Sequence, residues 1–152
     1  LLDAGALRLL TNKAFSKMKL HDQMVLTPHP GEAADMLKVS TQEIQKDRIE
    51  SAKKLQKKYN CIIVLKGQGT IICNKKEMYL CSSGGPELAV AGTGDILSGV
   101  IGSLIAQGLA PLDAAIAGVG LHAQAGENFA TDVGKIGLAA SELIPQIRKL
   151  LN

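Results

Sequence analysis

Aromatic side chains are scarce in this chain: phenylalanine, tyrosine and tryptophan make up 3% of its 152 residues, and tryptophan is absent. Lysine and arginine outnumber the acids by three, but they gather at 46–58 and 75–76, the pattern of a solvent-exposed helix face and a turn. Proteins that bind nucleic acid commonly combine basic patches with aromatic rings that stack on bases. We therefore expect no nucleic acid among the partners.

Cysteine is also rare. Cys61, Cys73 and Cys81 show no Cys-x-x-Cys spacing, and their number is odd. Zinc sites and disulfide frameworks need paired or regularly spaced cysteines. All three fall in strand-like segments, so we interpret them as buried thiols of a protein from a reducing compartment.

Long uninterrupted apolar runs are missing as well. The longest apolar region, 88–121, contains Asp95, Ser98, Gln107 and Asp113, so we expect no membrane span and no membrane partner. No basic segment followed by an apolar one opens the chain, and cytoplasmic localisation is the default expectation. The first residues read as a strand that enters a helix, which predicts that the beginning of the domain lies upstream of Leu1.

Glycine, by contrast, is abundant, and residues 84–108 bring a glycine-rich turn directly before an apolar helix. The helix is predicted to begin near Thr93, within Gly92-Thr93-Gly94-Asp95. Its apolar residues recur with helical spacing and predict one broad buried face: Ile96, Leu97, Val100, Ile101, Leu104 and Ile105. The first N–H groups of a helix lack internal partners, so such a turn suits a phosphate.

Asp95 is the unusual residue in this turn because a carboxylate repels the anion that the N–H groups attract. One interpretation is a general base that takes a proton from a hydroxyl attacking a phosphoryl group. The alternative is that Asp95 only complements the helix dipole and that the glycines serve packing. The four residues alone do not separate these interpretations.

The preceding part of the chain reads as alternating strands and helices. A short strand at 24–27 runs into Pro28-His29-Pro30-Gly31-Glu32, after which a helix begins, and the β-branched run 61–65 is typical of a central strand covered on both faces. Two successive hairpins, with turns at 66–70 and 75–76, would add antiparallel strands at 71–74 and 77–81 to the sheet edge. The resulting α/β fold places the 28–32 loop at a strand's carboxyl end, where such sheets bind ligands.

Three further signals concern helices and the strand-end loop. Ser40 and Glu43 fit a capping box for one helix burying five residues: Ile44, Ile49, Ala52, Leu55 and Tyr59. Gly108 and Pro111 predict a helix end and the next helix start. His122 in that second helix is expected to be a packed or partly exposed histidine rather than a metal ligand. The segment 66–70 suits either phosphate or an ordinary hairpin.

Three stretches, LTPHPGEAADML at 26–37, VLKGQGT at 64–70 and ELAVAGTGDILSGVIGSLIAQGL at 87–109, together resemble the ADP/ATP-dependent NAD(P)H-hydrate dehydratases. The resemblance runs from Leu2 nearly to Pro145. It implies a ribokinase-like three-layer sandwich with a mainly parallel sheet and antiparallel edge hairpins. It also implies that 1–152 is the C-terminal portion of one dehydratase domain whose N-terminal part precedes Leu1.

The resemblance implies repair of hydrated NADH or NADPH. A nucleotide phosphorylates the hydroxyl of the S epimer, and loss of phosphate regenerates the reduced cofactor. Asp95 matches the catalytic base, and the backbone of Gly92, Thr93 and Gly94 would stabilise the transferring phosphoryl group.

The implied binding residues fall into two sets. The nucleotide, ADP or ATP with Mg²⁺, would contact one set: Lys66, Gly67, Gln68, Gly69, Thr70, Gly85 and Gly94. The hydrated cofactor would contact the other: His29, Pro30, Gly31, Glu32 and Asp95. No protein ligand is assigned to a metal. The resemblance also implies a homo-oligomer and an epimerase, fused or separate.

One departure precedes the turn. Many relatives carry Gly-Asn-Pro-Gly-Met-Ala-Thr where this chain has Gly84-Gly85-Pro86-Glu87-Leu88-Ala89-Val90, which removes an asparagine that could contact the nucleotide. Two alternatives remain beside the dehydratase. One is a ribokinase-like kinase of a vitamin precursor or sugar alcohol, against which His29 and the following Pro-Gly-Glu argue. The other is a truncated, non-catalytic nucleotide-binding module.

Overall fold

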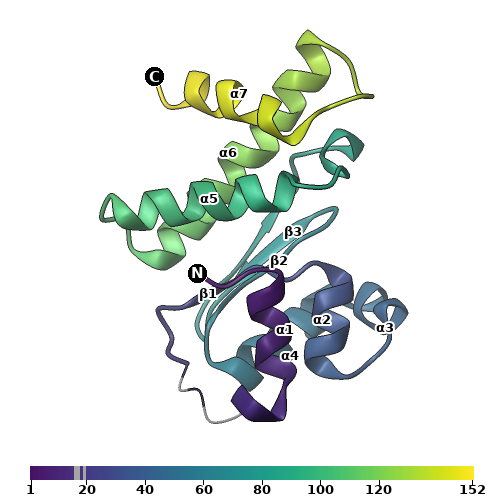
Figure 1. Cartoon of the computed structure of the whole chain (residues 1–152), viewed down its shortest axis with the longest axis vertical. Coiled ribbons are helices and arrows are strands. Elements are labelled where there is room, and N and C mark those ends of the chain that lie inside the picture. Colours follow the sequence, from purple (N-terminus) through teal and green to yellow (C-terminus); the bar gives the residue numbers. More distant parts are fainter. Residues whose placement is uncertain (16–17, 19) are drawn as a thin grey trace. The chain divides into compact units, whose positions relative to one another are not determined.

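The computed structural model describes residues 1–15, 18 and 20–152 and divides into two compact units, Leu1–Leu80 and Cys81–Asn152 (Figure 1). The first unit contains these elements in order: α1 Gly5–Thr11, a 3-10 turn Lys13–Phe15, β1 Val25–Leu26, α2 Pro30–Leu37, α3 Thr41–Lys46, α4 Arg48–Tyr59, β2 Ile62–Leu65, β3 Thr70–Cys73 and β4 Met78–Cys81, whose last residue opens the second unit. The second unit continues with η2 Pro86–Leu88, α5 Thr93–Ala106, α6 Pro111–Asp132, η3 Ala140–Glu142 and α7 Leu143–Leu150.

The sheet of the described residues has four strands in the order β1-β2-β3-β4. β1 and β2 are parallel, with Val25 opposite Ile62, whereas β2 and β3 are antiparallel. Leu2 adds a parallel bridge to Leu26 on the other side of β1. The predicted combination of parallel strands with an antiparallel edge is therefore confirmed.

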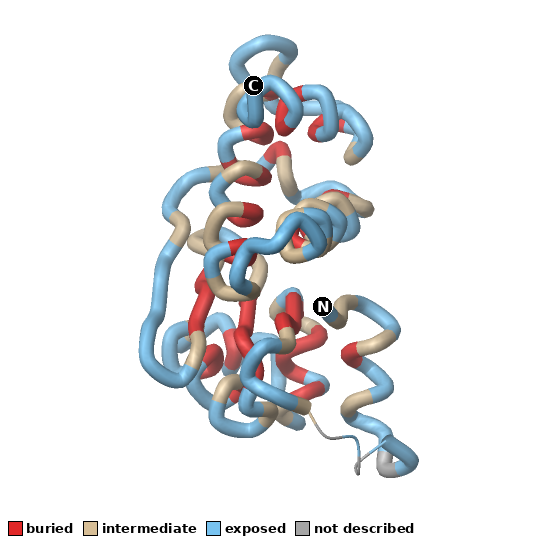
Figure 2. Tube along the Cα trace, turned by 90° about the vertical axis from the view of Figure 1, so that its left-hand side faces the viewer, coloured by how far each residue is buried: buried red, intermediate tan, exposed pale blue. Residues whose placement is uncertain are grey.

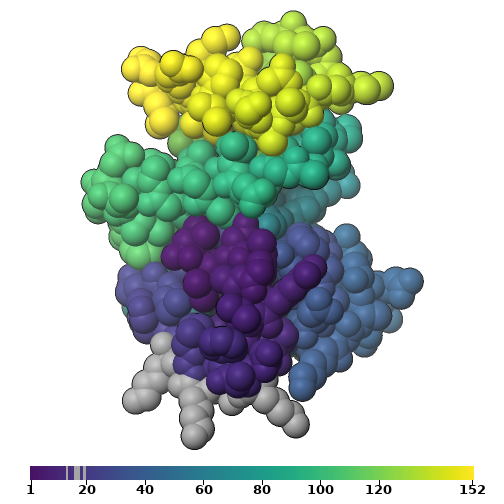
Figure 3. All heavy atoms as spheres, in the orientation of Figure 1, coloured from purple at the N-terminus to yellow at the C-terminus, as the bar shows by residue number. Residues whose placement is uncertain are grey.

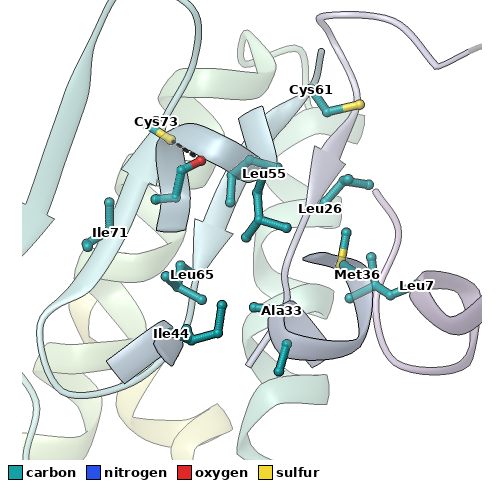
Figure 4. Packing of buried hydrophobic residues seen from close by; sticks show 13 residues of the cluster. Leu7, Leu26, Ala33, Met36, Ile44, Leu55, Cys61, Leu65, Ile71 and Cys73 are labelled. Carbon is teal, nitrogen blue, oxygen red and sulfur yellow. Dashed lines mark hydrogen bonds between the residues drawn. The ribbon is translucent and has the colours of Figure 1, made fainter. Parts of the chain in front are cut away.

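Alternate strand residues form the core of the first unit together with the four helices. Ile63 and Leu65 of β2 belong to this core and are 0% exposed. Leu65 lies there near Leu55 of α4, and α1 contributes Leu7, both also 0% exposed (Figure 4). The outer residues of α1 stay on the surface (Figure 3). The intervening residues of β2 are buried too, so the prediction of a central strand covered on both faces is confirmed.

Several predictions in this unit were wrong in detail. The single helix expected after Ser40 is two helices, because the Asp47 carboxylate accepts the Glu50 N–H and starts α4 as an N-cap. Ile49, expected to be buried, is 52% exposed. Cys61 and Cys73 are buried as predicted, but Cys81 is only half-buried. The Ser40–Glu43 capping box is confirmed.

In the second unit α6 packs against both α5 and α7. α5 begins at Thr93 as predicted and ends in a Schellman motif, in which Gly108 has a φ of 100° and the Leu109 N–H donates to the Leu104 carbonyl. Pro111 opens α6, and buried residues recur along this helix (Figure 2). On α5 the buried face is narrower than predicted, because only Leu97 and Ile101 of the six apolar residues are fully buried.

The small residues of α6 allow close helix packing. A Cβ at Gly118 would lie 2.6 Å from Ile101 Cγ1 of α5, so a larger residue there would separate the helices. None of the helices in the described part of the chain is both long and apolar enough to span a bilayer.

Candidate functional site

In the first unit, three polar residues follow three parallel chain segments. Asp3 follows Leu2, His29 lies three positions after the end of β1, and Lys66 follows β2 directly. The pairing continues past β1, because the Lys66 N–H donates to the Pro28 carbonyl at 2.9 Å. The parallel register therefore brings these residues to the carboxyl edge of the sheet, the usual ligand position in this class of fold.

Lys66 joins two carboxylates at this edge. Its Nζ lies 2.9 Å from Asp3 Oδ1 and 4.0 Å from Glu32 Oε2. The three side chains are 16%, 12% and 7% exposed, respectively. Asp3 Oδ1 also accepts the N–H of Ala4, which has a φ of 47° where the chain turns into α1. The positive charge of Lys66 is thus already shared between two acids.

His29 is the N-cap of α2. Its Nδ1 accepts the N–H groups of Gly31 at 3.0 Å and Glu32 at 3.2 Å, while Glu32 Oε2 accepts the His29 N–H at 2.8 Å. Pro30 occupies the first helical position, where its missing N–H costs nothing. Because Nδ1 is an acceptor, the ring proton lies on Nε2, 3.5 Å from Glu32 Oε2, and the ring is 54% exposed.

The charges of this cluster determine which ligand groups it favours. Two carboxylates and one ammonium leave an excess of one negative charge beside the imidazole of His29. Such a cluster attracts groups that donate hydrogen bonds, such as hydroxyls and amides, and a phosphate would compete with Asp3 for Lys66. The exposed Nε2–H of His29 adds one donor for a ligand oxygen.

Arg48 of α4 holds the loop between β2 and β3. Its guanidinium donates to the carbonyl oxygens of Leu65, Lys66 and Gly69 at 3.1–3.4 Å. Burial lowers the pKa of Arg48 from its ordinary value. Gly67 has a φ of 137°, and a Cβ there would lie 2.6 Å from Arg48 Nη1, so both conformation and space require glycine.

The remaining residues of this loop differ in exposure. Gln68 is exposed, and Gly69 has a φ of 66°. Thr70 Oγ1 donates to the Gly67 carbonyl at 3.1 Å and closes the turn. The loop therefore has a defined shape, and its carbonyl groups point toward Arg48.

In the second unit, the predicted glycine turn lies at the start of α5. Gly92 is the N-cap with a φ of 91°, a conformation that L side chains rarely adopt. The N–H groups of Gly94 and Asp95 belong to the first helical turn, where no helical carbonyl precedes them. The Asp95 side chain is exposed. A carboxylate and two oriented N–H donors thus lie within one helical turn.

Thr93 is buried, and its side chain has a structural role. Oγ1 lies 2.8 Å from both the Leu88 and the Val90 carbonyl oxygens. The Thr93 carbonyl lies 2.9 Å from Nε2 of His122 on α6. His122 is 9% exposed, so the expectation of a packed histidine is confirmed.

Two carboxylates occupy the N–H groups ahead of the turn. Glu127 Oε1 of α6 accepts the Gly84 N–H at 2.9 Å, and Glu87 Oε1 accepts the Gly85 N–H at 2.7 Å. Both carboxylates line a cavity of about 270 Å³ beside η2. A Cβ at Gly85 would lie 2.5 Å from Glu87 Oε2, so this chain accommodates Glu87 because residue 85 is glycine.

The predicted residues therefore form two groups. The first unit brings His29, Glu32 and Lys66 together, and the second unit brings Gly92–Asp95 next to the segment that contains Gly85. Among the described residues, no three His, Cys, Asp or Glu side chains are arranged to hold a metal ion.

Sequence reasoning missed four residues: Asp3, Arg48, Glu87 and Glu127. For Asp3 a signal existed, because an acid directly after a strand end is placed at the ligand edge. Glu87 was noted only as part of a departure from the family pattern. Arg48 and Glu127 lie in helices among other charged residues, and nothing local distinguishes them.

Comparisons with known proteins agree with these motifs. Residues 1–149 match the carbohydrate-kinase-type family described as NAD(P)H-hydrate dehydratase. The chain is 43% identical to a bifunctional NAD(P)H-hydrate repair enzyme of Coxiella burnetii over 99% of this chain and 30% of that protein. It is 39% identical to the ADP-dependent (S)-NAD(P)H-hydrate dehydratase of Neisseria meningitidis over 99% of this chain and 52% of that protein.

A solved structure shows the same relationship. The ADP/ATP-dependent NAD(P)H-hydrate dehydratase of Bacillus subtilis, co-crystallised with ATP and Mg²⁺, matches 99% of this chain and 53% of its own with a TM-score of 0.84 and 33% identity. The ribokinase-like α/β fold predicted from the sequence is thereby confirmed. This chain spans about half, or less, of the length of these relatives. It belongs to the NAD(P)H-hydrate dehydratase family.

Proposed function

We propose that the protein containing this chain dehydrates the S epimer of hydrated NADH or NADPH at the expense of ADP or ATP. The single observation that carries the proposal is the exposed Asp95 carboxylate in the first turn of α5, directly after the left-handed Gly92. The chain's membership of the NAD(P)H-hydrate dehydratase family supports assigning this reaction, with Asp95 proposed as its base. Sequence, local geometry and family thus support the same chemistry.

In the proposed reaction Asp95 accepts the proton of the hydrate's hydroxyl group. The hydroxyl oxygen forms a bond to the terminal phosphorus of the nucleotide as the bond to the leaving AMP or ADP breaks. Phosphate then leaves with a proton of the neighbouring carbon, which restores the ring double bond. The backbone of Gly92, Thr93 and Gly94 is proposed to stabilise negative charge on the transferring group, and the first-turn N–H groups of Gly94 and Asp95, which no helical carbonyl precedes, support this role.

Mg²⁺ would accompany the nucleotide and neutralise charge on its phosphates. Proteins usually bind this ion through one or two carboxylates together with substrate phosphates. Most of its ligands would then come from the nucleotide and water, and no residue of this chain is proposed as a ligand because Asp95 is kept for the proton transfer. The Bacillus subtilis relative was crystallised with ATP and Mg²⁺.

The cluster of the first unit supports a role toward the hydrated nicotinamide. Its excess negative charge suits the donor groups of a carboxamide, and the Nε2–H of His29 suits an oxygen acceptor. We therefore propose that the segment His29, Pro30, Gly31 and Glu32 contacts the hydrated cofactor. Lys66 is proposed to orient Asp3 and Glu32 in addition to any contact with nucleotide.

Further proposals concern the cellular setting. An epimerase, fused or separate, would supply the S epimer, and the relative from Coxiella burnetii is described as bifunctional. The free cysteines, which are typical of a reducing compartment, support the cytoplasm as the proposed location. A homo-oligomer is also proposed.

The test is to mix the full-length protein with hydrated NADH, Mg²⁺ and either ADP or ATP, and to follow the return of reduced-nicotinamide absorbance. Recovery that requires the nucleotide is the expected result. If absorbance does not return while a vitamin precursor or sugar alcohol becomes phosphorylated, the related kinase function replaces this proposal. Nucleotide binding without either reaction would identify a non-catalytic module.

Asp95→Asn is the first variant to compare. Because Asn keeps the size of the side chain but cannot accept the hydroxyl proton, kcat should fall by roughly 10²–10⁴-fold. Nucleotide affinity, measured by calorimetry, should change little because the first-turn N–H groups remain. A variant that loses nucleotide binding yet keeps its turnover would contradict the role of Asp95 as base.

A further inference from the structure

One face of α6 contacts the segment 84–93 at both of its ends. The face consists of His122, Ala123, Gly126 and Glu127, whose i, i+1, i+4 and i+5 spacing places them side by side on the helix. We propose that this face positions the catalytic turn, with His122 acting through Thr93 and Glu127 acting through Gly84. This inference rests on the proposed function, because the residue that the turn positions is Asp95, the base of the proposed reaction.

At the C-terminal end of the segment, His122 contacts the first helical residue of α5. Its Nε2 lies 2.9 Å from the Thr93 carbonyl oxygen, and a carbonyl can only accept, so Nε2 carries the proton. The imidazole is 9% exposed, and a hydrogen bond in a buried, low-dielectric site is stronger than one in water. This bond ties α6 to the residue two positions before Asp95.

The Thr93 side chain connects this end of the segment 84–93 to residues earlier in it. Its hydroxyl lies 2.8 Å from two carbonyl oxygens, those of Leu88 and Val90, and donates its single proton to one of them at a time. Thr93 therefore links the start of α5 to the end of η2. The backbone between them includes Gly92, whose left-handed conformation turns the chain into the helix.

At the N-terminal end, Glu127 fixes the other side of the segment. Its Oε1 accepts the Gly84 N–H at 2.9 Å. Between the two ends the Leu88 side chain lies over Gly126, where a Cβ would be only 2.7 Å from it. A Cβ at Gly84 would likewise lie 3.3 Å from Ala123 Cβ. The α6 face thus contacts the segment at its start, its middle and its end.

The consequence is a turn whose position depends on a helix that carries no reacting group. Phosphoryl transfer is catalysed largely by positioning, and a displacement of about 1 Å can lower the rate by roughly 10²-fold. His122 and Glu127 are accordingly positioning residues. Their loss should lower kcat while the nucleotide still binds.

The test compares His122→Met with His122→Gln in the full-length protein. Gln can place a donor near the position of Nε2, whereas Met keeps the volume and removes the donor. We expect kcat of H122M to fall roughly 10–100-fold with the nucleotide KM within about 2-fold of the wild type, and H122Q to regain most of kcat. Unchanged kcat in a folded H122M, or a raised KM with normal kcat, would overturn the proposal.

Val119→Ala is the matched control. Val119 is 3% exposed on the same helix, and its side chain has no hydrogen-bonding group, so V119A loosens packing without removing a bond to the turn. V119A should lower the melting temperature and leave kcat unchanged. An equal loss of kcat in V119A and H122M would reduce His122 to an ordinary packing residue and contradict the proposal.

A second pair of variants, at Glu127, and a measurement of amide hydrogen exchange complete the test. If H122M does not fold, Glu127→Ala and Glu127→Gln make the same comparison at Gly84, because Gln keeps an acceptor oxygen. Amide hydrogen exchange of 88–97 should quicken in H122M or E127A and not in V119A. If the wild-type protein fails to repair hydrated NADH, the proposed function falls, whereas the exchange data still confirm or refute the positioning role.

Discussion

At the scale of single residues, Lys66 supplies the positive charge that lies next to two carboxylates at the sheet edge, those of Asp3 and Glu32. Its Nζ lies 2.9 Å from Asp3 Oδ1 and 4.0 Å from Glu32 Oε2. Lys66→Met leaves both acids without this cation in a mostly buried site, and we expect a loss of about 2 kcal/mol in the free energy of unfolding, less than for a fully buried pair. Urea unfolding followed by circular dichroism measures it.

Lys149→Met provides the matched comparison for Lys66. Lys149 and Asp132 are 3.9 Å apart, but their side chains are 68% and 53% exposed, so K149M should change stability by less than about 0.5 kcal/mol. Equal effects of K66M and K149M would show that the Lys66 cluster behaves as a surface ion pair.

The same cluster illustrates which single residues a sequence can and cannot identify. Lys66 and His29 were predicted because each follows a recognisable strand within a motif. The pairing of Lys66 with Asp3 spans 63 positions and depends on the order of parallel segments, which local patterns do not contain. Arg48 was missed for a similar reason, since its carbonyl partners lie 17 to 21 residues away across a strand.

At the scale of elements, α2 begins with a histidine cap. Two substitutions of His29 separate its structural role in capping from its proposed role in binding. His29→Ala removes the acceptor of the Gly31 and Glu32 N–H groups and should cost about 1 kcal/mol. His29→Asn keeps a cap, because the Asn oxygen accepts the same N–H groups, but it removes the Nε2–H donor. Thermal unfolding should therefore place H29N close to the wild type and H29A below it.

Activity gives the second half of this comparison. Both variants should raise the KM for the hydrated cofactor if the Nε2–H contacts it, although only H29A loses stability. A normal KM in H29N would restrict His29 to capping α2.

Elements were predicted well where the local signal was strong. The start of α5, the Ser40 capping box, Gly108 and Pro111 all carry chemistry that acts within a few residues, and each was confirmed. The break at Asp47 was missed because the apolar residues on both sides of it were assigned to one helix face. The step of five residues from Ile44 to Ile49 departs from helical spacing, and Ile49 is exposed. The narrow buried face of α5 also depends on neighbouring helices rather than on its own period.

At the scale of the whole molecule, each of the two units has its own buried cluster. Two of the three cysteines, Cys61 and Cys73, lie in the core of the first unit. Burial raises the pKa of both thiols to about 11. Their sulfur atoms lie 3.2 Å from the Tyr59 carbonyl oxygen and 3.7 Å from that of Ala52, respectively.

These thiols predict a loss of stability in alkaline solution. A thiol whose pKa is higher in the folded than in the unfolded chain stabilises the fold below its ordinary pKa, and this stabilisation is lost as the pH rises through the folded value. The free energy of unfolding should therefore fall between pH 9 and about 11. Burial raises the pKa of Tyr59, which adds to the fall, whereas burial followed by the charge of Lys38 lowers the pKa of Lys58, which opposes it.

The double substitution Cys61→Ala and Cys73→Ala isolates the thiols from these other groups. Both substitutions leave small cavities, so the variant should start less stable at pH 8, but its urea-unfolding midpoint should decline less steeply between pH 9 and about 11. Tyr59 and Lys58 titrate in both proteins, so the difference in slope belongs to the two thiols. Parallel slopes in wild type and variant would show that ionisation of Cys61 and Cys73 does not limit the alkaline stability of the first unit.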